Sequence, residues 1–165
     1  WKNIKFNVNL SDCQNITDLG VASSMLGNVH TLNLSYTNIT YVSMLGNVHT
    51  LILYGCKNIT DVSMLGNVHT LNLSYTNITD VSMLGNVHTL NLSDCQNITD
   101  VSMLGNVHTL TLYKCNNITD VSMLGNVHTL CLSDCKNITD VSMLGNVHTL
   151  SLARTNITED RKSCG

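Results

Sequence analysis

The sequence has 165 residues, of which 43% are hydrophobic and 12% charged, so its composition fits one globular domain and excludes a disordered chain. Its formal net charge is −3, and its eight Lys and Arg residues are scattered except for Arg161-Lys162, which argues against a nucleic-acid-binding stripe. No apolar run approaches the roughly 18 residues of a membrane span. We therefore expect neither nucleic acid nor a membrane as a partner.

The N-terminal residues differ in composition from a run of near-identical repeats that follows them. Trp1 and Phe6 are the only Trp and Phe of the chain, and Phe6 alternates with Val8 and Leu10 as in a strand. A stack of repeats exposes its core at each end unless a cap covers it. We expect residues 1–24 to form an N-terminal cap and the first coil.

Residues 25–157 repeat one phrase at intervals of 19 or 20 residues. The short unit carries a Thr, as in "LNLSYTNIT", and the long unit carries a Cys and one extra residue, as in "LNLSDCQNIT". Self-similarity at such a period is typical of a solenoid, in which neighbouring units cover one another's open faces. The repeated letters therefore predict a stack of short coils.

Each unit predicts a short strand followed by one tight helical turn. In "VHTLNLS", Val87, Leu90 and Leu92 would point inward while the residues between them point outward. After the next turn of the chain, "ITDVSMLGN" shows no strand alternation. An Asp such as Asp80 can cap a 3-10-like turn there, and we expect Gly85 to end it with a positive φ.

The segment "VHTLILYGCKNI", residues 48–59, matches the pattern LxxLxLxxCxxI, and residues 68–78 match a shorter form that ends in TxI. The chain therefore resembles a leucine-rich repeat array from about residue 8 to residue 157. The resemblance implies an α/β-type solenoid that is mostly β, a gently curved right-handed coil with one short parallel strand and one 3-10-like turn per unit. The phrase "LGNVHTLNLS" is similar to arrays encoded by giant DNA viruses of amoebae, and near-identity of the units equally suits a consensus-designed repeat protein.

The resemblance also implies that the Cys or Thr of each unit points inward and satisfies backbone groups of the loop. In this sequence those residues are Cys13, Thr37, Cys56, Thr76, Cys95, Cys115, Cys135 and Thr155.

After Ile157 the sequence becomes the polar stretch "TEDRKSCG", residues 158–165. We expect a polar C-terminal tail on one continuous domain, too short to complete another coil. Three explanations remain open: the tail is a minimal cap, the native protein continues, or stacks join end to end.

Seven His residues occupy the same place in successive units, and we expect them to form one column. The column could be a metal strip or a pH switch, or a ladder of imidazoles that hydrogen-bonds along one edge. Zinc requires ligands that converge from different directions, whereas a column offers neighbours on one line. We therefore expect no metal site and no cofactor.

The repeated Asp and Met residues each have a structural and a functional interpretation. Single carboxylates such as Asp61 and Asp100 lack the clustered oxygen ligands of a calcium site, which favours capping. Met64 lies between Val62 and Leu65, two residues expected to face inward. It could fill the core or belong to an apolar stripe on the outer side.

The seven Cys residues include five at the inward position, which we expect to be reduced, whereas Cys131 and Cys164 are candidates for accessible thiols. Eight copies of "NIT" and four of "NLS" match the N-glycosylation pattern, and a glycan in every coil would crowd a buried Ile. Both observations favour an intracellular or bacterial-type setting: the cytoplasm, or the host cytoplasm or virion if the chain is viral.

The units differ from one another mainly at the outward strand position and at the turn that follows it. Four of the five tyrosines lie there, and exposed Tyr is a favoured anchor in protein interfaces. The candidate partner-binding residues are Asn33, Tyr36, Ile52, Tyr54, Asn72, Tyr75, Asn91, Asp94, Thr111, Tyr113, Lys114, Cys131, Asp134 and Arg154. Drift at unconstrained surface sites is the other explanation of this variation.

No nucleophile, base and orienting group break the repeat symmetry, as a single active site would require, so we expect no enzyme. The sequence predicts a non-enzymatic scaffold that binds a protein partner through the outward strand face. One alternative is a structural element that self-associates end to end or through the Met stripe. Another is an ice-binding surface on the outward Thr column, whose regularity Tyr54, Lys114 and Arg154 interrupt.

Overall fold

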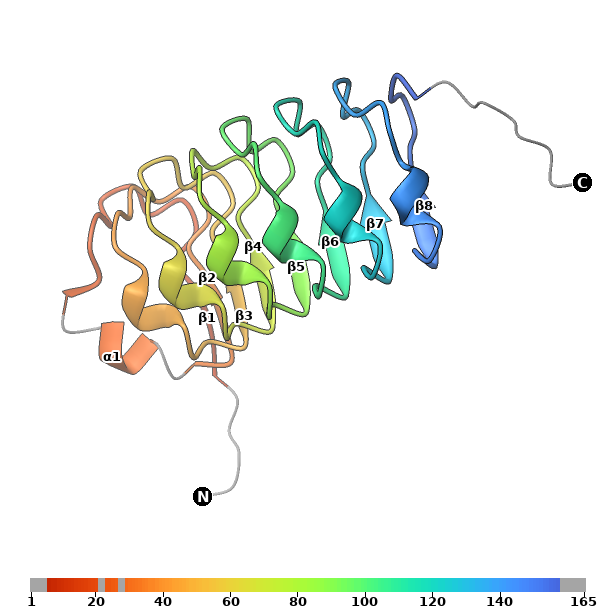
Figure 1. Cartoon of the computed structure of the whole chain (residues 1–165). Helices are drawn as coiled ribbons and strands as arrows, with labels where there is room; N and C mark the ends of the chain where they lie inside the picture. Colours follow the sequence, from red (N-terminus) through yellow and green to blue (C-terminus); the bar gives the residue numbers. More distant parts are fainter. Residues whose placement is uncertain (1–5, 21–22, 27–28, 158–165) are drawn as a thin grey trace, which may run out of the picture.

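The computed structural model describes residues 6–20, 23–26 and 29–157. Eight strands form a single parallel sheet in chain order, and the coils stand side by side in one row (Figure 1). Equivalent residues of neighbouring units face each other, as Thr89 of one strand pairs with Thr109 of the next. The strands are β1 (Asn7–Asn9), β2 (Thr31–Asn33), β3 (Thr50–Ile52), β4 (Thr70–Asn72), β5 (Thr89–Asn91), β6 (Thr109–Thr111), β7 (Thr129–Cys131) and β8 (Thr149–Ser151).

A ladder of 3-10 turns forms the other side of the coils. In the first coil the short helix α1 (Ser23–Leu26) takes the place of such a turn. The predicted unit of one strand and one tight turn is therefore confirmed. The turns are η2 (Ser43–Leu45), η3 (Ser63–Leu65), η4 (Ser82–Leu84), η5 (Ser102–Leu104), η6 (Ser122–Leu124) and η7 (Ser142–Leu144).

The hydrophobic core lies between the sheet and the 3-10 turns and continues from coil to coil. Each inner unit contributes the same fully buried set, because each repeats the same apolar positions. Burying one such side chain contributes about 1.5 to 3 kcal/mol. In the unit that contains β5 the set is Val87, Leu90, Leu92, Cys95, Ile98, Val101 and Leu104.

The segment predicted to form an N-terminal cap and the first coil, residues 1–24, is described only in part. Val8 and Leu10 pack against the core as half-buried residues, whereas Phe6 leaves 62% of its surface exposed. Phe6 therefore does not continue the inward alternation of the strand. Trp1 and the tail at residues 158–165 lie outside the described residues.

The predicted positive φ at Gly85 is wrong, since this glycine has φ −61°. A Cβ atom at Gly85 would lie 2.4 Å from the carbonyl oxygen of Met103 in the next coil. The glycine is needed because the backbone of the following 3-10 turn approaches so closely. The same contact occurs at Gly46, Gly66, Gly105 and Gly125.

The repeated Asp residues order the entry to five of the six described 3-10 turns, η3 to η7, although they do not occupy the N-cap position itself; before η2 the equivalent residue is Tyr41. Asp80 Oδ1 accepts a hydrogen bond of 2.9 Å from the Ser82 amide, and the Asp lies one residue before the N-cap, Val81. The donated amide hydrogen bonds hold the pKa values of these carboxyl groups below their usual range. The residues concerned are Asp61, Asp80, Asp100, Asp120 and Asp140.

We expect stability to fall in acid because of these carboxylates. A carboxyl group whose pKa is lower in the folded chain stabilises it above the unfolded-state pKa, and that contribution is lost as the pH falls through the folded-state pKa. Urea unfolding measured at steps below about pH 4 should show a steady loss of unfolding free energy. A free energy that stays constant over that interval would contradict this assignment.

The Cys and Thr residues of successive units form an internal hydrogen-bonded spine. Thr76 Oγ1 donates to the carbonyl oxygen of Leu73 in its own coil at 2.7 Å, and Cys95 Sγ reaches back to the same oxygen at 3.1 Å. The implied inward role is confirmed at Thr37, Cys56, Thr76, Cys95, Cys115, Cys135 and, half-buried, at Thr155. Cys13 is exposed instead, because none of the described residues forms a coil before it that would cover this turn.

We expect only some of the thiols to react in the folded protein. Burial raises the pKa values of Cys56, Cys95 and Cys115, and raises that of Cys135 to about 11. A thiol that stays protonated and buried is a poor nucleophile. Iodoacetamide and mass spectrometry should therefore find these four cysteines modified only after unfolding.

Cys13 is the internal control for this experiment, because it is exposed in the native fold. It should be alkylated rapidly, and the half-buried Cys131 more slowly. Rapid native labelling of Cys95 or Cys115 would show that the spine is open to solvent. Cys164 lies outside the described residues and is best replaced by serine for this measurement.

The His column is present as a row of stacked rings. Ring centroids of neighbouring imidazoles lie 4.5 to 4.7 Å apart from His30 to His148. His69 Nδ1 lies 3.2 Å from Thr70 Oγ1, and equivalent contacts recur in later coils. Within the described part of the chain, no three His, Cys, Asp or Glu side chains converge as metal ligands.

No helix in the described part of the chain is long and apolar enough to cross a membrane.

Candidate functional site

The strand face consists of the outward residues of the strands and the turn residues that follow them. The structure places the candidate residues at three positions of this segment: the strand end, and two and three residues after it. Asn33, Ile52, Asn72, Asn91, Thr111 and Cys131 end their strands and are half-buried. Tyr54 and Tyr113 come two residues later and are also half-buried. Tyr36, Tyr75, Asp94, Lys114, Asp134 and Arg154 come three residues later, each with φ between 57° and 63°.

The third position holds side chains in a left-handed backbone conformation that most residues avoid. Backbone hydrogen bonds between coils fix it, since the Tyr36 amide donates to the Tyr54 carbonyl at 2.8 Å and the Tyr75 amide to the Ser93 carbonyl at 2.9 Å. The frame thus presents one side chain per coil in a set direction. Sequence reasoning missed this conformation, because Gly55 is the only glycine in the equivalent place.

The strand-end asparagines have a structural role that the sequence prediction did not assign to them. Asn33 Oδ1 accepts the Ser35 amide at 2.9 Å, and Asn72 and Asn91 do the same for the serines two residues on. The repeated "NLS" spacing carried this signal, which is typical of an Asx turn. Ser35, Ser74 and Ser133 are themselves buried, so this position is not an outward surface in every coil.

Three tyrosines from successive coils form a tyrosine cluster at the N-terminal half of the strand face. The ring centroids of Tyr36 and Tyr54 lie 5.0 Å apart in an edge-to-face arrangement, and those of Tyr54 and Tyr75 lie 5.7 Å apart. A hydrogen bond to Tyr54 raises the pKa of Tyr36. Lys57 Nζ lies 4.7 Å from the centroid of the Tyr75 ring.

Gly55 makes room for this cluster. A Cβ atom at Gly55 would lie 2.8 Å from Cδ1 of Tyr36, and the glycine itself has φ 71°. The missing side chain allows the Tyr36 ring to lie across the next coil and meet Tyr54. The cluster therefore requires two differences between units, Tyr36 in one coil and Gly55 in the next. Drift at one site alone would not produce it.

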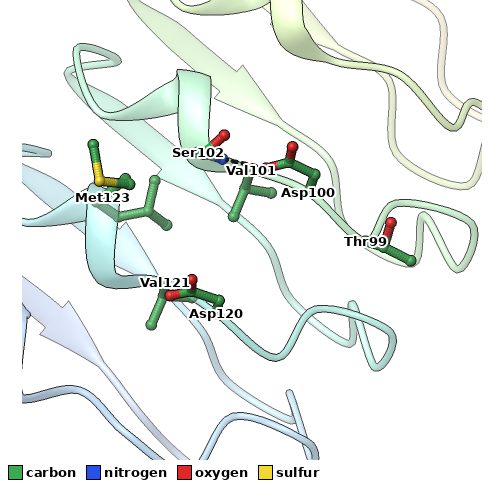
Figure 2. Close-up of a pocket in the computed structure, with 8 residues that line it drawn as sticks. Thr99, Asp100, Val101, Ser102, Asp120, Val121 and Met123 are labelled. Atoms are coloured by element: carbon green, nitrogen blue, oxygen red, sulfur yellow. Dashed lines mark hydrogen bonds between the residues drawn. The ribbon is translucent and has the colours of Figure 1, made fainter.

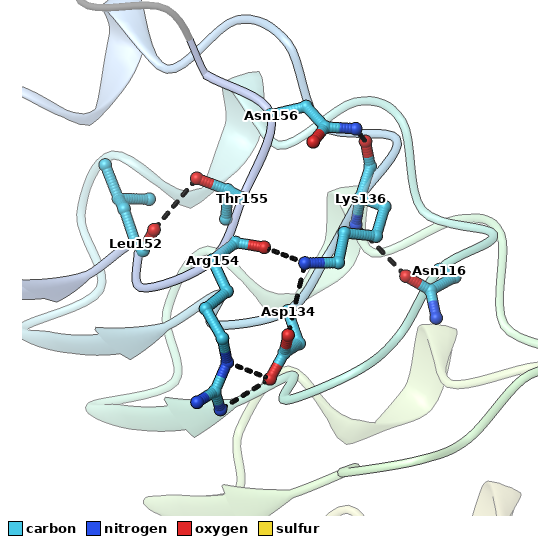
Figure 3. Close-up of polar contacts among 7 residues, drawn as sticks. All are labelled: Asn116, Asp134, Lys136, Leu152, Arg154, Thr155 and Asn156. Carbon is cyan, nitrogen blue, oxygen red and sulfur yellow. Dashed lines mark hydrogen bonds and ion pairs between the residues drawn. The ribbon is translucent and has the colours of Figure 1, made fainter.

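The C-terminal half of the strand face carries ion pairs instead. Asp134 lies 2.7 Å from Arg154 Nη2 and 3.2 Å from Lys136 Nζ (Figure 3). The hydrogen bond from Arg154 lowers the pKa of Asp134 to about 2, and Lys136 adds to the effect. Lys114 lies with its Nζ 5.1 Å from the ring centroid of Tyr113. The two halves of the face thus differ in chemistry, one aromatic and one charged.

Lys57 and Lys136 are site residues that the sequence prediction missed. Both occupy the extra position of the long unit, directly after the inward Cys. The short unit has no residue at that position. Variation among equivalent positions of all units therefore gave no signal for Lys57 or Lys136.

The asparagines of the "NIT" segments form a ladder beside this face. Asn77 Nδ2 donates to the Lys57 carbonyl at 3.0 Å, and Asn97 Nδ2 donates to the Asn77 carbonyl at 3.2 Å. Asn137 and Asn156 continue the pattern, the latter onto the Lys136 carbonyl shown in Figure 3. A glycan on any of these nitrogens would have to be accommodated beside the neighbouring coil.

Eight parallel strands, a facing ladder of 3-10 turns and an inward Cys or Thr in each inner unit define a class of protein. The chain has the fold of a leucine-rich repeat protein with short units. A sequence model of the family described as "Leucine Rich repeat" matches residues 67–84 and 86–104.

Solved structures with a similar fold include internalins of Listeria monocytogenes. Internalin InlF shows 28% sequence identity and a TM-score of 0.65, with 82% of this chain and 44% of that chain covered. Internalin C2 shows 27% identity and a TM-score of 0.64, covering 82% and 66%. The functional domain of InlJ, which includes a cysteine ladder, shows 21% identity and a TM-score of 0.58, covering 94% and 40%. The chain thus spans between 40% and 66% of the length of these structures.

Among curated protein sequences, none matches the chain. The leucine-rich repeat fold is commonly a scaffold for protein–protein interaction and typically carries no catalytic function.

Proposed function

We propose that this chain is a non-enzymatic scaffold that binds a protein partner through its strand face. The tyrosine cluster of Tyr36, Tyr54 and Tyr75 is the observation that carries the proposal. Tyr36 and Tyr75 leave 49% and 43% of their surface exposed, although they contact other rings. Aromatic residues on a fixed backbone lose little conformational entropy on binding, which makes them effective anchors.

The charged half of the strand face would set the orientation of the partner. Asp134 already pairs with both Lys136 and Arg154, which leaves a net charge of +1, so a partner need not supply an opposite charge for each of the three. Rim charges of this kind affect association rate and specificity more than affinity. We therefore assign the binding energy chiefly to the tyrosine cluster.

The test is affinity capture with the whole chain followed by measurement of the dissociation constant for each captured protein. Replacing Tyr36 and Tyr75 by alanine should weaken binding by more than about tenfold, as expected for hot-spot residues. Tyr41→Ala is the matched control, because Tyr41 is 73% exposed but lies before η2 on the other side of the coil. A partner that is retained by the Tyr36/Tyr75 variant and lost with Tyr41→Ala would overturn the proposal.

Self-association is a second candidate function, and the free edge of β8 favours it. Among the described strands β8 pairs only with β7. Val147, Leu150 and Leu152 are half-buried, whereas the same positions one coil earlier are fully buried. Sedimentation over a concentration series would detect it as a rise in mass. A loss of that rise with reductant would assign it to a disulfide rather than to the strand edge.

We also infer an intracellular location. The cysteines in the described part of the chain are free, and the asparagines of the "NIT" segments use their Nδ2 atoms in hydrogen bonds between coils. Fractionation of the native host, combined with a glycosidase shift assay, would test this. A shift in mass after glycosidase treatment would contradict it.

A further inference from the structure

The repeated methionines lie on the outer side of the coils, where they form a row that we call the Met row. Their exposure decides whether Met64 fills the core or belongs to an apolar stripe. The methionines leave 59% to 77% of their surface exposed, so they form an apolar stripe and do not fill the core. The Met row consists of Met25, Met44, Met64, Met83, Met103, Met123 and Met143. Exposed methionines in a row are typical of surfaces that accept apolar side chains of varied shape.

An Asp row runs beside the Met row on the same side of the coils. It consists of Asp61, Asp80, Asp100, Asp120 and Asp140, all of which are exposed. Each uses one carboxylate oxygen, Oδ1, to accept the amide of the Ser two residues on. Their lowered pKa values keep them charged at neutral pH.

The two rows meet at a series of hollows between successive coils. In one of them Asp100, Asp120 and Met123 line a space of about 220 Å³, with Val101 and Val121 at its base (Figure 2). Three further hollows of about 160 to 240 Å³ repeat the same arrangement of two Asp residues and one Met. Each hollow thus combines an apolar wall with two carboxylates.

No described cation neutralises this outer side. Lys57 lies over the Tyr75 ring, Lys114 lies beside Tyr113, and Lys136 and Arg154 pair with Asp134, so all four contact the strand face. The described part of the chain therefore separates its charges, with cations on one side and an unpaired row of carboxylates on the other. Such a surface favours a cationic partner.

We propose that the Met row and the Asp row together form a second docking surface, for a basic amphipathic helix. The apolar face of the helix would lie on the methionines, and its Lys or Arg side chains would reach the carboxylates. This is the helix-in-groove mode of recognition. The proposal concerns the side opposite the strand face and does not depend on the function proposed above.

The spacing of the coils selects a helix over an extended segment. Successive coils lie about 4.6 Å apart at the His column, as the ring spacing of His69, His88 and His108 shows, and we take this spacing as the guide for the outer rows. A helix presents side chains on one face every 5.4 Å or so, whereas an extended chain does so only every 6.8 Å or so. The five coils of the Asp row span about 18 Å, which matches a helix of roughly 12 residues.

A second copy of this chain fits the surface less well. If the Met rows of two copies packed against each other, the five carboxylates of each Asp row would lie close to the same interface. Like charges at an interface cost free energy unless cations intervene. An anionic lipid surface is disfavoured for the same reason.

The experiment uses the whole chain labelled with ¹³C at the methionine methyl groups. The probe is a synthetic 14-residue helix with Leu on one face and Lys on the other. A scrambled peptide of the same composition and a peptide with Glu in place of Lys serve as controls. We expect the Leu/Lys helix to shift the methyl signals of Met83, Met103 and Met123, and both control peptides to bind at least tenfold more weakly.

Substitutions assign the interaction to the two rows. Asp80→Asn, Asp100→Asn and Asp120→Asn combined remove charge but keep an oxygen that can accept the Ser amide, so the fold is retained. This variant should bind the probe at least tenfold more weakly and lose most of the salt dependence. Met83→Gln with Met103→Gln should also weaken binding, whereas Tyr36→Ala should leave it unchanged.

Several results would overturn the proposal. Equal binding of the Glu peptide would remove the role of the Asp row, and methyl signals unshifted at saturation would place the probe elsewhere. Methyl shifts that follow protein concentration without peptide would instead assign the surface to self-association. Shifts produced by phosphatidylcholine vesicles, and not by the helix, would assign it to lipid.

Discussion

Gly85→Ala is expected to lower the free energy of unfolding by at least about 1 to 3 kcal/mol. The added Cβ would lie 2.4 Å from the carbonyl oxygen of Met103, which belongs to the backbone of the next coil. A backbone atom cannot rotate away as a flexible side chain can, so the two coils must separate. Chemical denaturation of the variant and the parent chain measures the loss.

Gly145→Ala is the matched control for this substitution. Gly145 occupies the same place in η7 with φ −60°, but no atom of the described residues lies within 4 Å of the Cβ it would gain. Removing a glycine from the unfolded chain should here stabilise the protein by about 0.4 to 1 kcal/mol. Equal losses at the two positions would show that coil contact is not the reason for the repeated glycine.

Leu90→Ala should cost about 2 to 5 kcal/mol, the usual range for a fully buried leucine replaced by alanine. Leu90 lies at the centre of β5 and is completely buried between its neighbours Leu71 and Leu110 in the sheet. Coils on both sides are held by their own contacts, so they cannot collapse to fill the cavity. Denaturation midpoints, measured with an unchanged dependence on denaturant, give the change in stability.

Leu150→Ala tests the same position at the open end of the stack. Leu150 lies at the centre of β8 and is only half-buried, because none of the described strands follows it. We expect a clearly smaller loss there than at Leu90. A loss as large as that of Leu90 would indicate that something covers the end, as a second copy of the chain would.

The repeated and the varied residues therefore have separate physical roles. Leu, Val, Ile and Cys or Thr at fixed positions build the core and the spine, and their effect on stability depends on how many coils flank them. Tyr36, Tyr54 and Tyr75 contribute little to that core and form an exposed cluster. Changes there should alter binding far more than stability.

Most of the architecture could be predicted from the amino-acid sequence of one repeat unit. The alternation in "VHTLNLS" placed Leu90 and Leu92 inside, and the break in alternation after "NIT" placed the tight turn. These patterns are local, since each side chain faces inward or outward according to its own strand or turn. The inward Cys or Thr came from the family resemblance, and it fails only at Cys13, where the stack begins.

The candidate site was predicted by position but not by arrangement. Variation between units identified Tyr36, Tyr54 and Tyr75, yet only the structure shows their rings in contact. Lys57 and Lys136 escaped notice because they occupy the extra residue of the long unit. The binding role of the predicted residues stays a prediction that the experiments above address.

The sequence by itself determined the period, the strand and turn of each unit and the inward leucines, because these depend on residues that are neighbours along the chain. Only the tertiary structure decided why Gly85 must be glycine, which tyrosine rings meet, and that the described cations lie on the side opposite the Met and Asp rows. Those features arise between residues of neighbouring coils, 18 to 21 positions apart in the sequence. Their distances are set by how closely one coil packs on the next, and no single unit contains that information.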